Sequence, residues 1–137
     1  MAAVMVDTSA VFALLDRSDN NHRQAVRILQ RLAKKKEGVL LTNYIVAETH
    51  ALILARLGAD LARSWLQSLR WPVERVSAVD EDRARAIILT FTDKEFSYTD
   101  ATTFAVMERM QLEYAFSFDR HFKQFGIKLL LTPPARG

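Results

Sequence analysis

Short apolar runs alternate with longer amphipathic segments along the chain, and this alternation limits the possible folds more than any other feature. Five apolar runs predict strands, at 3–6, 39–41, 73–76, 114–118 and 128–131. Amphipathic segments predict helices, at 10–15, 20–36, 43–57, 60–69, 80–91 and 99–110. Strands that alternate with helices in this way indicate an α/β domain with a central, mainly parallel sheet.

The composition excludes several classes of protein. The chain has 137 residues without an internal repeat or a linker, which predicts one domain over 1–137. It contains no cysteine, so disulfides, thiolate metal sites and cysteine nucleophiles are excluded. No apolar run approaches the roughly 18 residues of a membrane span, and we expect a cytoplasmic protein with no membrane partner. The formal net charge of +3 is compatible with a nucleic-acid partner but does not identify one.

Four carboxylates stand where strands end or helices begin: Asp7, Glu48, Asp100 and Asp119. Each has an ordinary explanation. Asp7 and Asp119 are suited to cap a helix, and Asp100 follows Ser97 at the spacing of a capping box. Glu48 has apolar neighbours on its helix face, where a carboxylate needs either a salt bridge from elsewhere or a metal.

Their joint occurrence points to a site. Strand ends and the following helix starts lie on one edge of a parallel sheet, so the four side chains should share a crevice. Like charges in one crevice raise each other's pKa, and a divalent cation relieves that repulsion. Oxygen ligands favour Mg²⁺ or Mn²⁺. Such ions activate water and stabilise the charge of an in-line phosphodiester displacement.

The order and context of these acids resemble a PIN domain over nearly the whole chain. The matching segments are VDTSA at 6–10, AET at 47–49, SYTDA at 97–101 and FSFDRHF at 116–122. The short length further resembles the VapC-type toxins of toxin–antitoxin pairs. The resemblance implies a three-layer α/β/α fold and a metal-dependent endoribonuclease that hydrolyses RNA. It also implies Mg²⁺ or Mn²⁺ as cofactor, a homodimer, and a cognate antitoxin that holds the enzyme inactive.

The resemblance assigns roles to individual residues. The catalytic and metal-binding quartet would be Asp7, Glu48, Asp100 and Asp119. Supporting hydroxyls near the site would come from Thr8, Ser9 and Ser117, the last standing where threonine is more usual. His121 is expected to be a surface residue in a turn near the mouth of the site, with Phe122 packed underneath.

Two surface features each allow two interpretations. Arg23, Arg27, Arg31 and Lys35 recur every four residues and form a basic row on one helix face. They would contact RNA phosphates or simply form a solvated face. The bulky apolar residues at 65–71 would pack in the core or form a dimer or antitoxin surface.

Two other functions compete with the nuclease. A non-catalytic RNA- or protein-binding module on the same fold would not need all four acids, and their retention argues against it. A phosphotransfer enzyme with Asp7 as nucleophile would want a second aspartate two residues later, where this chain has Ser9.

Overall fold

The structure, a computed structural model, describes residues 3–130. Within this range a sheet of five parallel strands has the order β3-β2-β1-β4-β5. The strands are β1 (Val4–Val6), β2 (Val39–Thr42), β3 (Val73–Glu74), β4 (Tyr114–Phe116) and β5 (Lys128–Leu129). Met5 of the central strand β1 lies opposite Leu40 on one side and Ala115 on the other. The predicted α/β class with a parallel sheet is confirmed.

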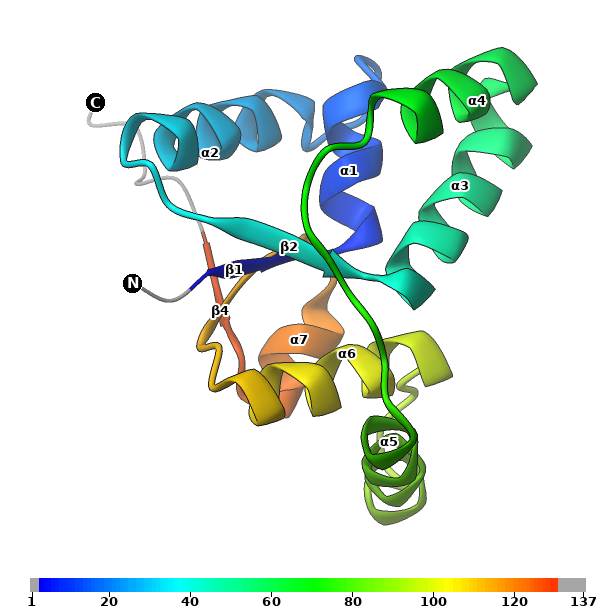
Figure 1. Cartoon of the computed structure of the whole chain (residues 1–137), viewed down its shortest axis with the longest axis vertical. Coiled ribbons are helices and arrows are strands. Elements are labelled where there is room, and N and C mark those ends of the chain that lie inside the picture. The colour runs from blue at the N-terminus through cyan, green and yellow to red at the C-terminus, as the bar shows by residue number, and fades with distance from the viewer. Residues whose placement is uncertain (1–2, 131–137) are drawn as a thin grey trace.

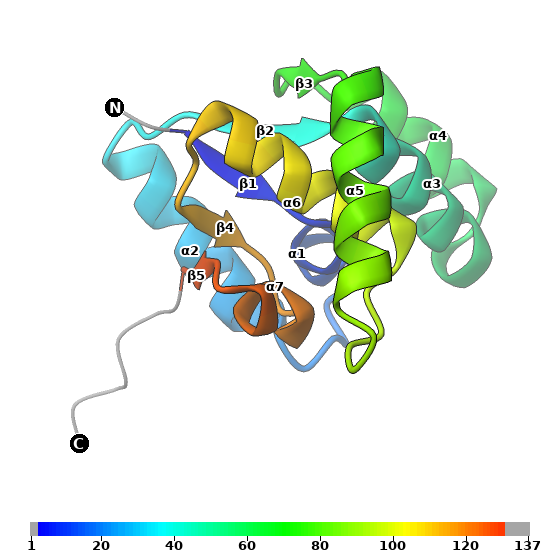
Figure 2. The same ribbon diagram turned by 90° about the horizontal axis from the view of Figure 1, so that it is seen from below.

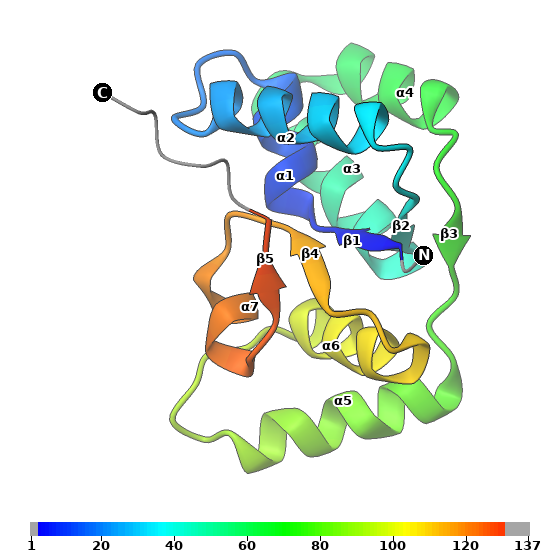
Figure 3. The same cartoon turned by 90° about the vertical axis from the view of Figure 1, so that its left-hand side faces the viewer.

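Seven helices in the described range cover both faces of this sheet. They are α1 (Thr8–Leu15), α2 (His22–Lys34), α3 (Asn43–Leu57), α4 (Ala59–Ser68), α5 (Ala78–Thr90), α6 (Tyr98–Met110) and α7 (Arg120–Phe125). Figure 1 shows α1 to α4 above the sheet and α5 to α7 below it. Figure 2 shows the lower helices from their outer side, and in Figure 3 β3 lies at the margin of the sheet. The predicted three layers are therefore present. None of the described helices is both long and apolar enough to cross a membrane.

Four of the five strands are shorter than the apolar runs that predict them, and β2 extends one residue beyond its run, to Thr42. The run at 114–118 stops being a strand at Phe116, because the next residues bond to side chains and not to a neighbouring strand. The Phe118 amide donates to Ser9 Oγ at 2.9 Å, and the Asp119 amide donates to Ser117 Oγ at 3.0 Å. Of the predicted strand at 128–131, residues 128 and 129 are extended, and position 131 lies outside the described residues.

An aromatic cluster fixes α7 against α6. The rings of Phe104 and Phe125 stack at 4.5 Å, and Phe104 meets Phe122 edge-on at 5.1 Å. Phe122 is fully buried, as the sequence predicts. Burial of rings of this size contributes on the order of 2 kcal/mol each, so these contacts hold α7 against the middle of α6.

Candidate active site

Asp7 is the most deeply placed acid of the site. It follows β1 at the carboxyl edge of the sheet, is only 4% exposed, and is the N-cap of α1. Its Oδ2 accepts hydrogen bonds from Ser9 Oγ at 2.8 Å and from Ser117 Oγ at 2.9 Å, with the Ser9 amide more distant at 3.4 Å. Capping and membership of a site are therefore compatible, and both serine hydroxyls bond to the Asp7 carboxylate.

Burial raises the pKa of Asp7 from 3.8 to about 6. The hydroxyls of Ser9 and Ser117 lower this pKa, and the negative charges of Glu48 and Asp100 raise it further. Asp7 is thus a carboxylate whose charge is poorly compensated by the protein itself. A cation in the same crevice would provide the missing compensation.

Asp100 is buried at the start of α6 and forms the predicted capping box with Ser97. Its Oδ2 accepts from the Ser97 amide at 3.1 Å, and the Asp100 amide donates to Ser97 Oγ at 3.0 Å. These bonds leave Oδ1 free of any partner within residues 3–130, so the carboxylate can still bind a ligand in the crevice.

Asp119 lies near Asp100 but belongs to the start of a different helix, α7. It lies three residues beyond the end of β4 and is the N-cap of α7, where Oδ1 accepts from the His121 amide at 2.9 Å. Ser117 joins Asp119 to Asp7, because its hydroxyl donates to Asp7 and accepts from the Asp119 amide.

His121 lies between two of the acids, which corrects the expectation of a surface residue in a turn. Its Nδ1 is 3.0 Å from Asp100 Oδ2 and 3.4 Å from Asp119 Oδ1. The His121 side chain is 24% exposed, so it is half-buried beside these acids. The sequence offers only a partial signal, because His121 follows the N-cap Asp119 by two residues, whereas its contact with Asp100 depends on how α7 packs against α6.

Glu48 occupies a different part of the crevice. It is half-buried on α3 and close enough to Asp7 to raise the pKa of that residue. Within the described residues no ion pair or hydrogen bond holds its carboxylate, so the alternative of a structural salt bridge has no support. The neighbouring Thr49 donates to Thr8 at 3.0 Å, which makes Thr8 a buried link between α1 and α3.

The donor atoms of this crevice suit a divalent cation. One ligand atom each from Asp100, Asp119 and His121 lies within 4.8 Å of the others. Asp7 and Glu48 add carboxylates close by, since the charges of Glu48 and Asp100 both raise the pKa of Asp7. Carboxylate oxygens are the ligands that Mg²⁺ and Mn²⁺ take most readily. The residues present therefore fit the predicted metal.

A family model for the PIN domain matches residues 4–128. This chain belongs to the PIN domain family. The chain is 33% identical over 126 residues to the 23S rRNA-specific endonuclease VapC20 of Mycobacterium tuberculosis, covering 90% of this chain and 94% of that protein. It is 30% identical over 127 residues to the VapC ribonuclease of Archaeoglobus fulgidus, covering 88% of this chain and 79% of that protein. The resemblance seen in the sequence is confirmed.

Solved structures agree with this assignment. The crystal structure of M. tuberculosis VapC20, described as a sarcin–ricin loop cleaving toxin, matches with a TM-score of 0.84 and 30% identity. That match covers 95% of this chain and all of the other. VapBC2 from Rickettsia felis, solved with a promoter DNA fragment, matches over 94% of this chain and 98% of the other, with a TM-score of 0.70. At 14% identity this second likeness shows the fold alone.

A partly buried ion pair outside the acidic crevice joins α5 to α6 in this PIN domain. Asp80 is buried in α5 and receives Arg109 Nε at 2.9 Å, while Arg109 also reaches Glu74 at 3.2 Å. Burial raises the pKa of Asp80, but hydrogen bonds from Arg109 and Ser77 outweigh burial and leave it below the usual value. No sequence pattern predicts this pair, because 29 residues separate its partners.

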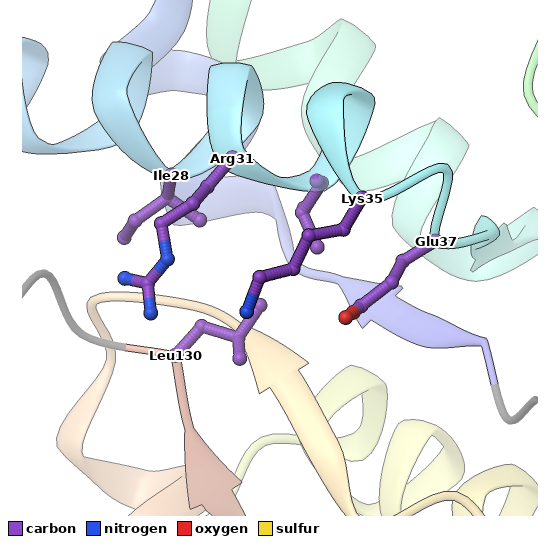
Figure 4. Close-up of a pocket in the computed structure, with 6 residues that line it drawn as sticks. Ile28, Arg31, Lys35, Glu37 and Leu130 are labelled. Carbon is purple, nitrogen blue, oxygen red and sulfur yellow. The ribbon is translucent and has the colours of Figure 1, made fainter.

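The basic row of this PIN domain is exposed along α2 but extends away from the acids. Because α2 connects α1 at the carboxyl edge to the start of β2, its Lys35 end lies near the amino edge of the sheet. Figure 4 shows Arg31 and Lys35 extending from α2 toward Leu130, with which they line a small pocket. Arg23 and Arg27 lie in the first half of α2, at the opposite end of the row from Lys35. RNA contact by the row remains a prediction.

The apolar segment at 65–71 divides between core and surface. Trp65 is buried, and Leu69 and Trp71 are half-buried, so core packing accounts for most of the segment. Leu66 is 45% exposed on α4, and Leu54 is similarly exposed on α3, which packs against α4. Each of these two packed helices therefore carries an exposed leucine side chain.

Proposed function

We propose that this chain, as a single PIN domain over 1–137, is a metal-dependent endoribonuclease that hydrolyses RNA phosphodiester bonds. The observation that carries the proposal is the convergence of Asp7, Asp100 and Asp119 from three distant segments at one edge of the sheet. Their charges are not compensated by a nearby arginine or lysine among the described hydrogen bonds and ion pairs. The names of the VapC relatives support the same activity.

Each residue of the crevice has a task under this proposal. Asp7, Asp100 and Asp119 would hold Mg²⁺ or Mn²⁺, with helix-capping bonds fixing each carboxylate in direction. Ser9 and Ser117 keep Asp7 oriented through their hydroxyls. Glu48, whose carboxylate is free of other partners in residues 3–130, would bind metal or position the attacking water. The bound cation would lower the pKa of that water and neutralise charge at the scissile phosphate.

Ribosomal RNA is the first substrate to test. The relative with 33% identity is named a 23S rRNA-specific endonuclease, and its crystal structure is described as that of a sarcin–ricin loop cleaving toxin. Phosphate contacts along the strand would come from the basic row, beginning with Arg23 and Arg27, because arginine forms bidentate bonds with phosphate.

We also propose that the protein acts in the cytoplasm as the toxin of a toxin–antitoxin pair, and that it forms a homodimer. The relatives named VapC and the exposed apolar side chains of α3 and α4 support a protein partner. Sedimentation of the chain alone and with the product of a neighbouring small reading frame tests both associations.

The activity is tested with purified protein and 23S rRNA, with and without Mg²⁺ or Mn²⁺. The Asp7→Asn variant is the inactive comparison, and Asp60→Asn is a matched control at an exposed position. We expect discrete products that require both a metal and Asp7, and that Asp60→Asn leaves unchanged. Cleavage by Asp7→Asn at the wild-type rate would contradict the proposal. Binding of RNA without cleavage would favour the non-catalytic module.

A further inference from the structure

The position of His121 is fixed by its surroundings. Its backbone amide bonds to Asp119 Oδ1 at 2.9 Å, in the first turn of α7. Its ring meets the buried ring of Phe96 edge-on, with 5.7 Å between centroids and an interplanar angle of 80°. The backbone bond fixes the start of the side chain, and the ring contact with Phe96 favours the orientation in which Nδ1 faces the acids.

The distances around Nδ1 are those between neighbouring ligands of one ion. In an octahedral site with bonds of roughly 2.1 Å, adjacent ligand atoms lie about 3 Å apart. Nδ1 is 3.0 Å from Asp100 Oδ2 and 3.4 Å from Asp119 Oδ1. In this structure Nδ1 and Asp100 Oδ2 share a direct hydrogen bond, which a metal ion bound between them would replace.

Ligand chemistry separates the candidate metals. Mg²⁺ is a hard ion that binds oxygen and keeps several waters, so a nitrogen ligand adds little to its affinity. First-row transition ions accept imidazole, and Mn²⁺ is the one that also suits a set made mostly of carboxylates. A nitrogen ligand beside two aspartates would therefore change metal selectivity more than metal affinity in general.

We propose that His121 is an inner-sphere nitrogen ligand of the metal site, beside Asp100 and Asp119, and that it makes this site favour Mn²⁺ over Mg²⁺. This inference rests on the proposed function, since it assigns a ligand to the same site. It adds a residue outside the acidic quartet and a metal preference that the four carboxylates alone would not produce.

The test measures metal binding in the absence of RNA. Titration calorimetry with Mn²⁺ and with Mg²⁺ compares the wild type with His121→Ala. We expect the variant to lose at least about tenfold in Mn²⁺ affinity, the loss typical when a metal's ligand support is removed, and to bind Mg²⁺ within about twofold of the wild type. His121→Asn, which offers an oxygen, should shift the preference toward Mg²⁺.

Pulsed electron spin resonance on bound Mn²⁺ gives a direct readout. Nitrogen modulation from a coordinated imidazole should appear in the wild type and change when histidine is labelled with ¹⁵N. It should persist in His50→Ala, because His50 lies on α3 and not on α7. This measurement needs only the wild-type and control proteins, so it decides the matter even if His121→Ala fails to fold.

The outcomes separate this inference from the proposed function. Mn²⁺ binding without nitrogen modulation would overturn the role of His121 and leave the nuclease proposal intact. Equal losses of Mn²⁺ and Mg²⁺ affinity in His121→Ala would also overturn it, since they would indicate a general structural effect. If the wild type binds neither metal, the proposed metal dependence itself fails, and the role of His121 fails with it.

Discussion

Replacing Asp7 with asparagine should make the metal-free protein more stable while it abolishes cleavage. The amide has nearly the shape of the carboxylate, can still accept from Ser9 or Ser117, and remains a good helix N-cap. What it removes is a charge that is buried beside Glu48 and Asp100. The stability gain should therefore come from electrostatics, with little change in packing.

The size of the effect follows from the pKa of Asp7. This pKa is 3.8 in an unfolded chain and about 6 in the folded protein, and each pKa unit corresponds to about 1.4 kcal/mol. The folded state keeps its proton up to about pH 6, whereas the unfolded state loses it near pH 4. Wild-type stability is therefore lost as pH rises through this window, by about 3 kcal/mol at pH 7.5 and about 1 kcal/mol at pH 4.5.

Urea unfolding in the presence of a chelator measures this difference at both pH values. Asp7→Asn should exceed the wild type by up to about 3 kcal/mol at pH 7.5, and the excess should shrink at pH 4.5. The exposed control Asp60→Asn should match the wild type at both. Adding Mn²⁺ should stabilise the wild type by mass action and do little for Asp7→Asn. Equal stability at pH 7.5, or an excess that does not shrink in acid, would refute the reasoning.

Three further perturbations test other parts of the molecule. Arg109→Met should lower the free energy of unfolding, measured in urea, by about 2 kcal/mol, because it leaves the buried Asp80 carboxylate without its cation. Arg83→Met removes a partner from an exposed ion pair and should lower it by less than about 1 kcal/mol. Equal losses in the two variants would show that the difference in burial does not matter. Ser117→Ala should shift the acid side of the pH–rate profile, measured at limiting Mn²⁺, to higher pH, because it removes a hydrogen bond that lowers the pKa of Asp7. Ser117→Thr keeps a hydroxyl and should leave the profile in place. An unshifted profile in Ser117→Ala would rule out this role. Changing Arg23 and Arg27 together to glutamine should reduce the slope of log RNA affinity against log salt by about 0.7 for each phosphate that the protein no longer neutralises, and an unchanged slope would remove this end of the row from the RNA path.

The sequence was sufficient for those parts of the site that depend on strand direction. Asp7 and Asp119 follow apolar runs, and Asp100 follows a capping serine, so a parallel sheet brings them to one edge whatever the details of packing. The same logic fails for residues placed by tertiary contacts. His121 lies beside the acids because Phe104 of α6 packs against Phe122 and Phe125 of α7 and so fixes the two helices together. These contacts join residues far apart in the sequence and are seen only in the structure.

Two local features that the sequence does not reveal have the same physical origin. The run at 114–118 is apolar to its end, but its last residues leave the sheet because Ser9, more than a hundred positions earlier, captures the Phe118 amide. The buried Asp80 resembles an ordinary helix-start acid in sequence, and only its approach to Arg109 reveals an ion pair. Both interactions depend on residues that periodicity does not connect.

The hydrogen bond between Ser117 and Asp7 ties the crevice to the order in which the chain is synthesised. Asp7, Glu48 and Asp100 all leave the ribosome before β4, which must insert beside β1 to bring Ser117 and Asp119 into place. Contacts this distant in sequence form late and slowly in folding. A growing chain would thus carry most of the acids without an assembled crevice. Under the proposed function, a nascent chain would therefore have no cleavage activity until β4 has left the ribosome and paired with β1.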